Sequence, residues 1–129
     1  MNNLIKIFYT ISLIIMISSC MQPITKLGLS YGAFLRPGGI EFKIYAPNSD
    51  KVKLVIFEKV DDESGNEYPM EKLENGDWTY FLKNAPLGTM YGYRLTGPWN
   101  DENVIVADPY SKATVTQNSW RHVAKSLVI

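Results

Sequence analysis

Apolar and polar residues alternate with a period of two along much of the chain after residue 39. Ile40, Phe42 and Ile44 alternate with charged or aromatic neighbours until Pro47 ends the run. Because successive side chains of a strand point to opposite faces of a sheet, this period is typical of a half-buried β-strand. On this pattern we expect strands over residues 40–45, 51–57, 68–73, 78–82 and 90–96.

The third and fourth of these strands are separated by the sequence Glu74-Asn75-Gly76-Asp77. Asn-Gly supplies the two positive-φ residues of a type I′ turn, which is the tight connection that best matches the twist of two antiparallel strands. We therefore predict a β-hairpin at this point, with a type I′ turn centred on Asn75 and Gly76.

No run of ten or more residues beyond the N-terminal segment keeps an apolar stripe at helical spacing. Valine, isoleucine, tyrosine and phenylalanine fill the regular segments instead, and these residues favour strands. Turn signals follow one another roughly every 8–12 residues, which favours a two-sheet sandwich of the immunoglobulin type over a barrel. The expected fold class is therefore all-β, in one domain.

The first twenty residues have the organisation of a secretory signal. Residues 1–6 carry one positive charge, residues 7–17 carry none, and two serines precede Cys20. The apolar run is shorter than the roughly 20 residues that a helix needs to cross a bilayer. The order Ile17-Ser18-Ser19-Cys20 resembles the bacterial lipobox, in which the cysteine is acylated and becomes the mature N-terminus.

On this interpretation residues 1–19 are a lipoprotein signal peptide, Cys20 is the lipidation site, and residues 20–26 are a tether. Two or more acyl chains give stable membrane attachment, so we expect an exported, membrane-anchored protein at the outer membrane or cell surface. The alternative is an ordinary signal peptide with an incidental cysteine. Cys20 is the only cysteine in the chain, so no internal disulfide can form.

Charge and metal-ligand content narrow the classes of partner. Thirteen Lys and Arg residues balance thirteen Asp and Glu residues. A chain without net charge has no long-range field that attracts nucleic acid, so a neutral partner is expected and nucleic acid is not. His122 is the only histidine, and no Cys, His and carboxylate cluster at ligand spacing accompanies it, so we expect no metal site. No cofactor is expected either.

Several short motifs occur together in one order. They are Gly39-Ile40-Glu41-Phe42-Lys43-Ile44-Tyr45-Ala46-Pro47, Lys51-Val52-Lys53-Leu54, Gly76-Asp77-Trp78, Tyr91-Gly92-Tyr93-Arg94-Leu95-Thr96-Gly97-Pro98-Trp99 and Asp108-Pro109-Tyr110-Ser111-Lys112-Ala113. Together they resemble the N-terminal carbohydrate-binding module of family 48, found in pullulanase, isoamylase and glycogen-debranching enzymes of glycoside hydrolase family 13. One departure is Tyr45, which stands where that group often has Trp.

The resemblance implies an immunoglobulin-like β-sandwich of the early set type over residues 27–116, with residues 117–129 as the start of a linker to a catalytic barrel. Retaining glycosidases need two carboxyl groups roughly 5–5.5 Å apart, and in this family both lie in the barrel. We therefore expect no catalytic residue in this chain and no hydrolysis by the chain alone.

The expected function is that of a non-catalytic module, in a truncated fragment, of a pullulanase-like α-1,6-glucan debranching system in starch or glycogen metabolism. Two alternatives stay open. One is an autonomous α-glucan-binding surface lipoprotein. The other is an immunoglobulin-like structural module that binds no sugar.

A neutral α-glucan is recognised by aromatic faces that stack on glucose rings and by a few polar groups that fix hydroxyls. Trp99 is the first candidate, because it follows Gly97-Pro98 at a strand end, and Arg94 is expected close to it. In glycogen-binding relatives a Lys and a Trp occupy similar places. The alternative is that Trp99 packs against the neighbouring barrel.

Trp78 is the remaining carbohydrate-binding candidate, although its alternation with Tyr80 and Leu82 favours a place in the core. By the same argument we expect Tyr91 and Tyr93 to be buried. The sequence Asp108-Pro109-Tyr110 is expected to be a structural turn, in which the aspartate side chain accepts hydrogen bonds from backbone donors.

Overall fold

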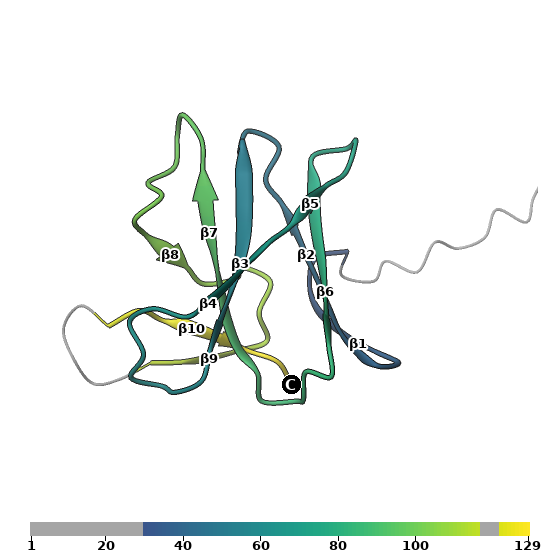
Figure 1. The fold of residues 1–129 in the computed structure, drawn as a ribbon, viewed down its shortest axis with the longest axis vertical. Helices are drawn as coiled ribbons and strands as arrows, with labels where there is room; N and C mark the ends of the chain where they lie inside the picture. Colours follow the sequence, from purple (N-terminus) through teal and green to yellow (C-terminus); the bar gives the residue numbers. More distant parts are fainter. Residues whose placement is uncertain (1–29, 117–121) are drawn as a thin grey trace, which may run out of the picture.

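The computed structural model describes residues 30–116 and 122–129, and within them it contains strands and turns but no helix. The strands form two antiparallel sheets (Figure 1). The all-β prediction and the immunoglobulin-like sandwich are thereby confirmed. The predicted signal peptide, Cys20, the tether and the first part of the predicted linker lie outside the described residues.

The first sheet has four strands in the order β1-β2-β6-β5. Their bounds are β1 Gly32–Arg36, β2 Gly39–Tyr45, β5 Glu71–Lys72 and β6 Asp77–Lys83. Strands β2 and β6 pair along their whole length, with Ile44 opposite Trp78. One face of this central pair points into the molecule, and the other carries Glu41, Lys43 and Tyr45 of β2 and the exposed Phe81 of β6.

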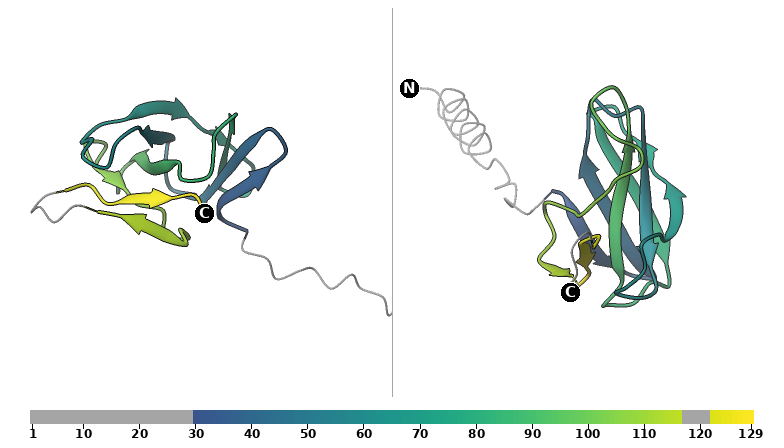
Figure 2. Two further views of the ribbon diagram at one scale, coloured as in Figure 1. Left: turned by 90° about the horizontal axis from the view of Figure 1, so that it is seen from below. Right: turned by 90° about the vertical axis from the view of Figure 1, so that its left-hand side faces the viewer.

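The second sheet has six strands, in the order β4-β3-β7-β10-β9 with β8 also paired to β7. Their bounds are β3 Lys51–Phe57, β4 Asn66–Pro69, β7 Met90–Thr96, β8 Ile105–Val106, β9 Ala113–Val115 and β10 Lys125–Leu127. Figure 2 shows β9 and β10 lying together at one margin of the sandwich. The predicted strands over 40–45, 51–57, 78–82 and 90–96 are confirmed as β2, β3, β6 and β7.

The core lies between the two sheets and is made by the alternating apolar positions of β2, β3, β6 and β7. Phe42 and Tyr91 face each other across the layers with ring centroids 4.8 Å apart, in an edge-to-face arrangement that aromatic pairs prefer. Tyr91 and Tyr93 are buried, as predicted, at 1% and 0% exposure. The hydroxyl of Tyr91 donates to Asp108 Oδ2 at 2.7 Å, so its polar end is satisfied inside the fold.

The predicted strand over residues 68–73 is wrong as a single strand. The chain leaves the second sheet after β4 and joins the first sheet as β5. Met70 lies at the crossing, where its side chain is buried and its N–H donates to the carbonyl of Val52 at 2.9 Å. Period-two alternation continues through the crossing, so the pattern alone did not reveal that the strand changes partners.

The hairpin between β5 and β6 is confirmed, but the predicted type I′ turn is wrong. Asn84 is the one non-glycine residue with a positive φ among the described residues, so Asn75 does not adopt the conformation that a type I′ turn requires. The Gly76 N–H instead donates to the carbonyl of Leu73 at 3.2 Å, and Gly76 itself has φ 87°. The connection is therefore longer than a two-residue type I′ turn: it is a β-turn that ends in a glycine with left-handed conformation.

A second, smaller group of buried side chains covers the outer face of the second sheet. Val55 and Phe57 are buried there, and the ammonium of Lys125 lies 4.7 Å from the centroid of the Phe57 ring. Lys125 Nζ donates to the carbonyl of Val60 at 2.6 Å and lies 3.3 Å from His122 Nε2. None of the ion pairs found among the described residues involves Lys125, and burial lowers the pKa of its ammonium.

Candidate functional site

Trp99 is the most exposed large apolar residue of the described chain, at 85% exposure. It lies in a turn after β7 in which the Asn100 N–H donates to the carbonyl of Gly97 at 3.1 Å. Pro98 takes the second position of this turn, where its fixed φ is favourable, so Trp99 follows at the turn's third position. A Cβ at Gly97 would lie 3.0 Å from the carbonyl oxygen of Asn48, so glycine is needed for this close approach.

Beside Trp99 the surface is hollowed, with a volume of about 240 Å³. Apolar side chains line most of it, and two polar ones lie at its edge. The lining residues are Leu95, Trp99, Asn100, Asp101, Val104 and Val106. Val104 and Val106 are themselves 49% and 39% exposed. The hollow therefore offers an indole face, an aliphatic wall and polar groups within one shallow depression, which is the combination that sugar recognition requires.

Backbone and side-chain hydrogen bonds fix the polar edge of this hollow. Asn100 Nδ2 donates to Ser49 Oγ at 3.1 Å, which joins the Trp99 turn to the loop between β2 and β3. Asp101 Oδ1 accepts from the N–H of Asn103 at 2.9 Å. These contacts hold the rim in one conformation before any ligand arrives, which lowers the entropy cost of binding.

Arg94 does not line the hollow, although the sequence predicted it close to Trp99. Adjacent strand residues point to opposite faces, so Arg94 points away from the face on which Leu95 joins the hollow. Its Nε donates to Glu67 Oε1 at 2.7 Å, and its Nη1 donates to the carbonyl of Glu102 at 2.6 Å. The second bond ties the segment leading to β8 onto β7, so Arg94 positions one wall of the hollow without facing it.

Glu67 is the partner that holds Arg94 in place. It also pairs with Lys53 Nζ at 2.7 Å. The hydrogen bond from Lys53 lowers the pKa of the Glu67 carboxyl, partial burial opposes this change, and the hydrogen bond from Arg94 adds to it. The carboxylate is therefore ionised near neutral pH and bridges the two cations.

Trp78, the other tryptophan candidate, lies in the core at 4% exposure. Its Nε1–H donates to the carbonyl of Ala46 at 2.9 Å, and Lys72 Nζ lies 5.2 Å from its ring centroid. No ring face is left for a sugar. The alternation of the sequence favoured a place in the core for Trp78, and the structure agrees. It gives no support to a carbohydrate contact at this residue.

The predicted structural turn at Asp108-Pro109-Tyr110 is confirmed. Asp108 Oδ1 accepts from the N–H of Tyr110 at 2.8 Å, and the Asp108 N–H donates to Ser126 Oγ at 2.8 Å. Burial, together with the hydrogen bond to Asp108, raises the pKa of the Tyr91 hydroxyl far above its usual value of 10. The turn therefore anchors the segment after β8 to the core.

The sequence did not predict a second group of aromatic residues at the surface, which we term the tyrosine cluster: Tyr31, Tyr45 and Tyr110. Ring centroids lie 5.9 Å apart between Tyr31 and Tyr45, and 5.2 Å apart between Tyr31 and Tyr110. Tyr45 is 50% exposed and Tyr110 is 39% exposed. The three residues are far apart in the sequence, so no spacing pattern could have joined them.

The described residues contain no group of three or more His, Cys, Asp or Glu side chains that could hold a metal ion. Nor is any helix within residues 30–116 and 122–129 long and apolar enough to cross a membrane.

A comparison with protein families matches residues 26–111 to the model of carbohydrate-binding module 48 (Isoamylase N-terminal domain). Among curated relatives, a glycogen debranching enzyme of Cronobacter sakazakii is 38% identical over 71 residues, covering 54% of this chain and 10% of that enzyme. The chloroplastic isoamylase SU1 of Zea mays is 30% identical over 103 residues, covering 69% of this chain and 13% of that protein.

Among solved structures, ligand-free PulA from Klebsiella pneumoniae superposes with a TM-score of 0.62 and 31% identity, covering 78% of this chain and 10% of PulA. The chain thus spans about a tenth of the length of the relatives that it matches. The match covers residues 26–111 and ends in the turn that contains Tyr110, so it includes the Trp99 hollow and the tyrosine cluster. The chain belongs to the carbohydrate-binding module 48 family, whose members form the N-terminal domain of glycoside hydrolase family 13 debranching enzymes such as isoamylase and pullulanase.

Proposed function

We propose that this chain is a non-catalytic α-glucan-binding module of a pullulanase-like debranching system, and that Trp99 is its main sugar contact. The observation that carries the proposal is the 85% exposure of Trp99 above a hollow with an aliphatic wall. A large exposed indole costs free energy in water, and a glucose ring stacked on its face would remove that apolar area from solvent.

The electrostatics of the hollow agree with a neutral ligand. The side chains that line it include one carboxylate, Asp101, and no Lys or Arg. Arg94, which is adjacent to Leu95 in β7, is already engaged by Glu67 and the carbonyl of Glu102. A phosphate or carboxylate ligand would therefore find no charge-assisted partner, whereas sugar hydroxyls can exchange hydrogen bonds with Asn100 and Asp101.

The proposed role is binding and not hydrolysis. A retaining glycosidase needs one carboxyl group kept protonated and a second about 5–5.5 Å away. The buried carboxyl groups of the described residues are Asp77 and Asp108, and both accept structural hydrogen bonds. The pKa of Asp77 is lowered, which is the opposite of what a general acid requires. We infer that any catalytic activity belongs to a separate part of such a system.

We further propose that the module is exported and held at the outer membrane or cell surface by acylation of Cys20. The support for this is the sequence alone: an uncharged run over residues 7–17 followed by Ser18-Ser19-Cys20. Radiolabelled palmitate incorporation into the wild-type chain and into Cys20→Ser tests it. Loss of label in the variant is expected, and equal labelling would contradict the assignment.

The glucan proposal is tested by affinity electrophoresis through native gels that contain glycogen or pullulan. We expect the wild-type chain to be retarded, and Trp99→Ala to weaken binding by about 30-fold or more, the usual effect of removing a central tryptophan from an interface. Trp99→Tyr should recover part of the binding, because it keeps an aromatic face. The acylated chain needs a detergent in these gels. That detergent must lack a sugar head group, because a maltoside would compete with the glucan for the site.

Leu87→Ala provides a matched control, because Leu87 is 58% exposed and does not line the Trp99 hollow. It should migrate as the wild type does. Unretarded migration of the folded wild-type chain would contradict glucan binding and would favour a structural module. Retardation that Trp99→Ala leaves unchanged would place the binding site elsewhere.

A further inference from the structure

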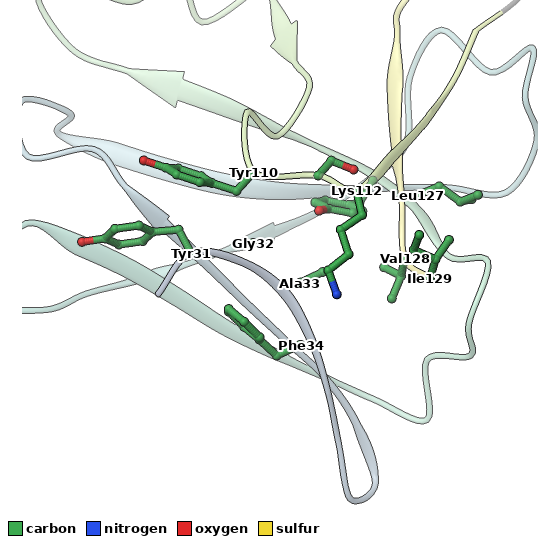
Figure 3. A pocket seen from close by; sticks show the side chains of 11 residues that line it. Tyr31, Gly32, Ala33, Phe34, Tyr110, Lys112, Leu127, Val128 and Ile129 are labelled. Carbon is green, nitrogen blue, oxygen red and sulfur yellow. The ribbon is translucent and has the colours of Figure 1, made fainter. Parts of the chain in front are cut away.

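The tyrosine cluster forms a second exposed aromatic surface, on the outer side of the first sheet. Tyr45 ends β2, Tyr31 immediately precedes β1, and Tyr110 belongs to the turn after β8. The ring planes are inclined by 45° between Tyr31 and Tyr45 and by 40° between Tyr31 and Tyr110. Figure 3 shows Tyr31 and Tyr110 side by side, both pointing away from Leu127, Val128 and Ile129.

A set of polar contacts holds the central ring of the cluster. The Tyr31 hydroxyl donates to Asp77 Oδ1 at 3.0 Å, and Lys43 pairs with Asp77 Oδ2 at 2.8 Å. Lys43 Nζ also lies 5.8 Å from the centroid of the Tyr31 ring. Asp77 is 1% exposed, so the network that orients Tyr31 is anchored inside the protein.

Close approaches by two glycines pack against the other two residues of the cluster, Tyr45 and Tyr110. A Cβ at Gly76 would lie 3.3 Å from the Tyr45 ring, so the β5–β6 turn packs closely against it. Gly32 permits a similar approach by Tyr110, because a Cβ at Gly32 would lie 3.4 Å from the carbonyl oxygen of Tyr110 and 3.6 Å from its Cβ. The Tyr45 ring and the backbone of Tyr110 are therefore packed against the fold, and contact with the Tyr31 ring further restricts both side chains, so less side-chain entropy remains to be lost when a ligand covers them.

We propose that the tyrosine cluster is a second α-glucan contact site, distinct from the Trp99 hollow. The identity of the ligand rests on the proposed function above. Three neighbouring rings, with Tyr31 inclined to each of the other two, suit a curved chain of α-linked glucose units better than a flat ligand. The phenol hydroxyls and the ammonium of Lys43, whose side chain is 27% exposed, supply polar partners for sugar hydroxyls.

The position of the cluster supports a shared ligand. Tyr45 leads into the loop that connects β2 to β3, and this loop contacts the Trp99 turn through Ser49 and Asn100. In Figure 1 the connections β2–β3, β5–β6 and β7–β8 all lie at the upper end of the sandwich. Tyr45, at the end of β2, and Trp99, in the β7–β8 connection, therefore both border the β2–β3 loop, and we expect a single polymer to reach both surfaces along it.

The test is a titration of the isotope-labelled full chain with maltoheptaose, in a detergent without sugar head groups, followed by NMR. We expect the amide signals of Tyr45 and Tyr110 to shift in the wild type and to keep shifting in Trp99→Ala. In the double variant Tyr45→Ala/Tyr110→Ala, the indole N–H signal of Trp99 should still shift. In glycogen gels, each tyrosine substitution should weaken binding by about two- to tenfold.

Phe81→Ala is the matched control, because Phe81 is an aromatic residue 41% exposed on the same sheet and outside the cluster. It should bind as the wild type does. Tyrosine variants that bind glycogen normally, while Trp99→Ala binds weakly, would overturn the second site and leave the first intact. If the tyrosine amide signals shifted while the Trp99 indole signal did not, the Trp99 site would be overturned and the tyrosine cluster would remain. The buried Trp78 indole signal reports that each variant is folded.

Discussion

Asp77 is a buried carboxylate whose removal should lower the stability of the fold strongly. It is 1% exposed, yet it pairs with Lys43, accepts from Tyr31 and accepts from Asn75 Nδ2 at 2.8 Å. Replacement by alanine would leave these donors without their acceptor. Breaking a buried ion pair by removal of one partner costs about 3–5 kcal/mol. Because the Lys43 side chain is 27% exposed and can regain water, we expect Asp77→Ala to lose about 2–3 kcal/mol.

For a domain of this size that loss corresponds to a melting temperature lower by about 10–20 °C. Asp77→Asn keeps the volume and one acceptor oxygen for Tyr31 but loses the charge, so it should lose about 1–2 kcal/mol. Urea denaturation followed by far-ultraviolet circular dichroism measures both values. The comparison separates the contribution of the charge from that of the hydrogen-bond geometry.

The stabilisation from Asp77 should also depend on pH. Burial opposes ionisation of this carboxyl, but the hydrogen bonds from Lys43, Asn75 and Tyr31 outweigh it and lower its pKa below the usual 3.8. A folded-state pKa below the unfolded value stabilises the fold above about pH 4, and the contribution is lost as the pH falls through the folded pKa. The difference between wild type and Asp77→Ala must therefore shrink in acid. A difference below about 0.5 kcal/mol at neutral pH, or one that does not change with acidification, would refute the reasoning.

Two further substitutions test other parts of the fold by the same denaturation assay. Lys125→Met should raise the free energy of unfolding by about 1 kcal/mol near neutral pH, because burial of the ammonium beside Phe57 costs more than its hydrogen bond to Val60 and the more distant Asp61 and Asp62 return, and no ion pair within the described residues involves it; a loss of stability would contradict this. Gly76→Ala should destabilise by more than Gly88→Ala. Both glycines have positive φ, of 87° and 84°, but only at Gly76 would a new Cβ meet an atom, at 2.8 Å from Pro47. Equal losses would show that backbone strain alone matters.

The sequence predicted the central strands well because each is amphipathic over its whole length. In β2, the inward positions Ile40, Phe42 and Ile44 are all buried, so burial and alternation agree residue by residue. The crossing at Met70 could not be predicted in this way. The alternation of a strand fixes which side chains point inward, but it does not say which strand accepts the hydrogen bonds. At the crossing the Met70 side chain joins the core while its N–H stays bonded to Val52 of β3, and neither contact leaves a trace in the alternation.

The candidate site was predicted in part. The Gly97-Pro98 turn indicated that Trp99 would be exposed, and it is. Arg94 was placed beside it on proximity in the sequence, although strand alternation already puts Arg94 and Leu95 on opposite faces. The tyrosine cluster left no local signal, since the rings meet only after β1, β2 and the turn after β8 have assembled.

The shallowness of both aromatic surfaces leads to a last prediction about ligand size. The Trp99 hollow is open and the tyrosine cluster is a group of rings at the surface, so each contact alone should bind short oligosaccharides weakly. A polymer that reaches both makes the second contact intramolecular, at an effective concentration that can raise avidity by about 10²–10⁴. At equal glucose concentration, glycogen should therefore bind far more tightly than maltotriose. The advantage should fall when either surface is removed by Trp99→Ala or Tyr45→Ala. If the preference for glycogen survived in both variants, linkage between the two surfaces could not be its cause.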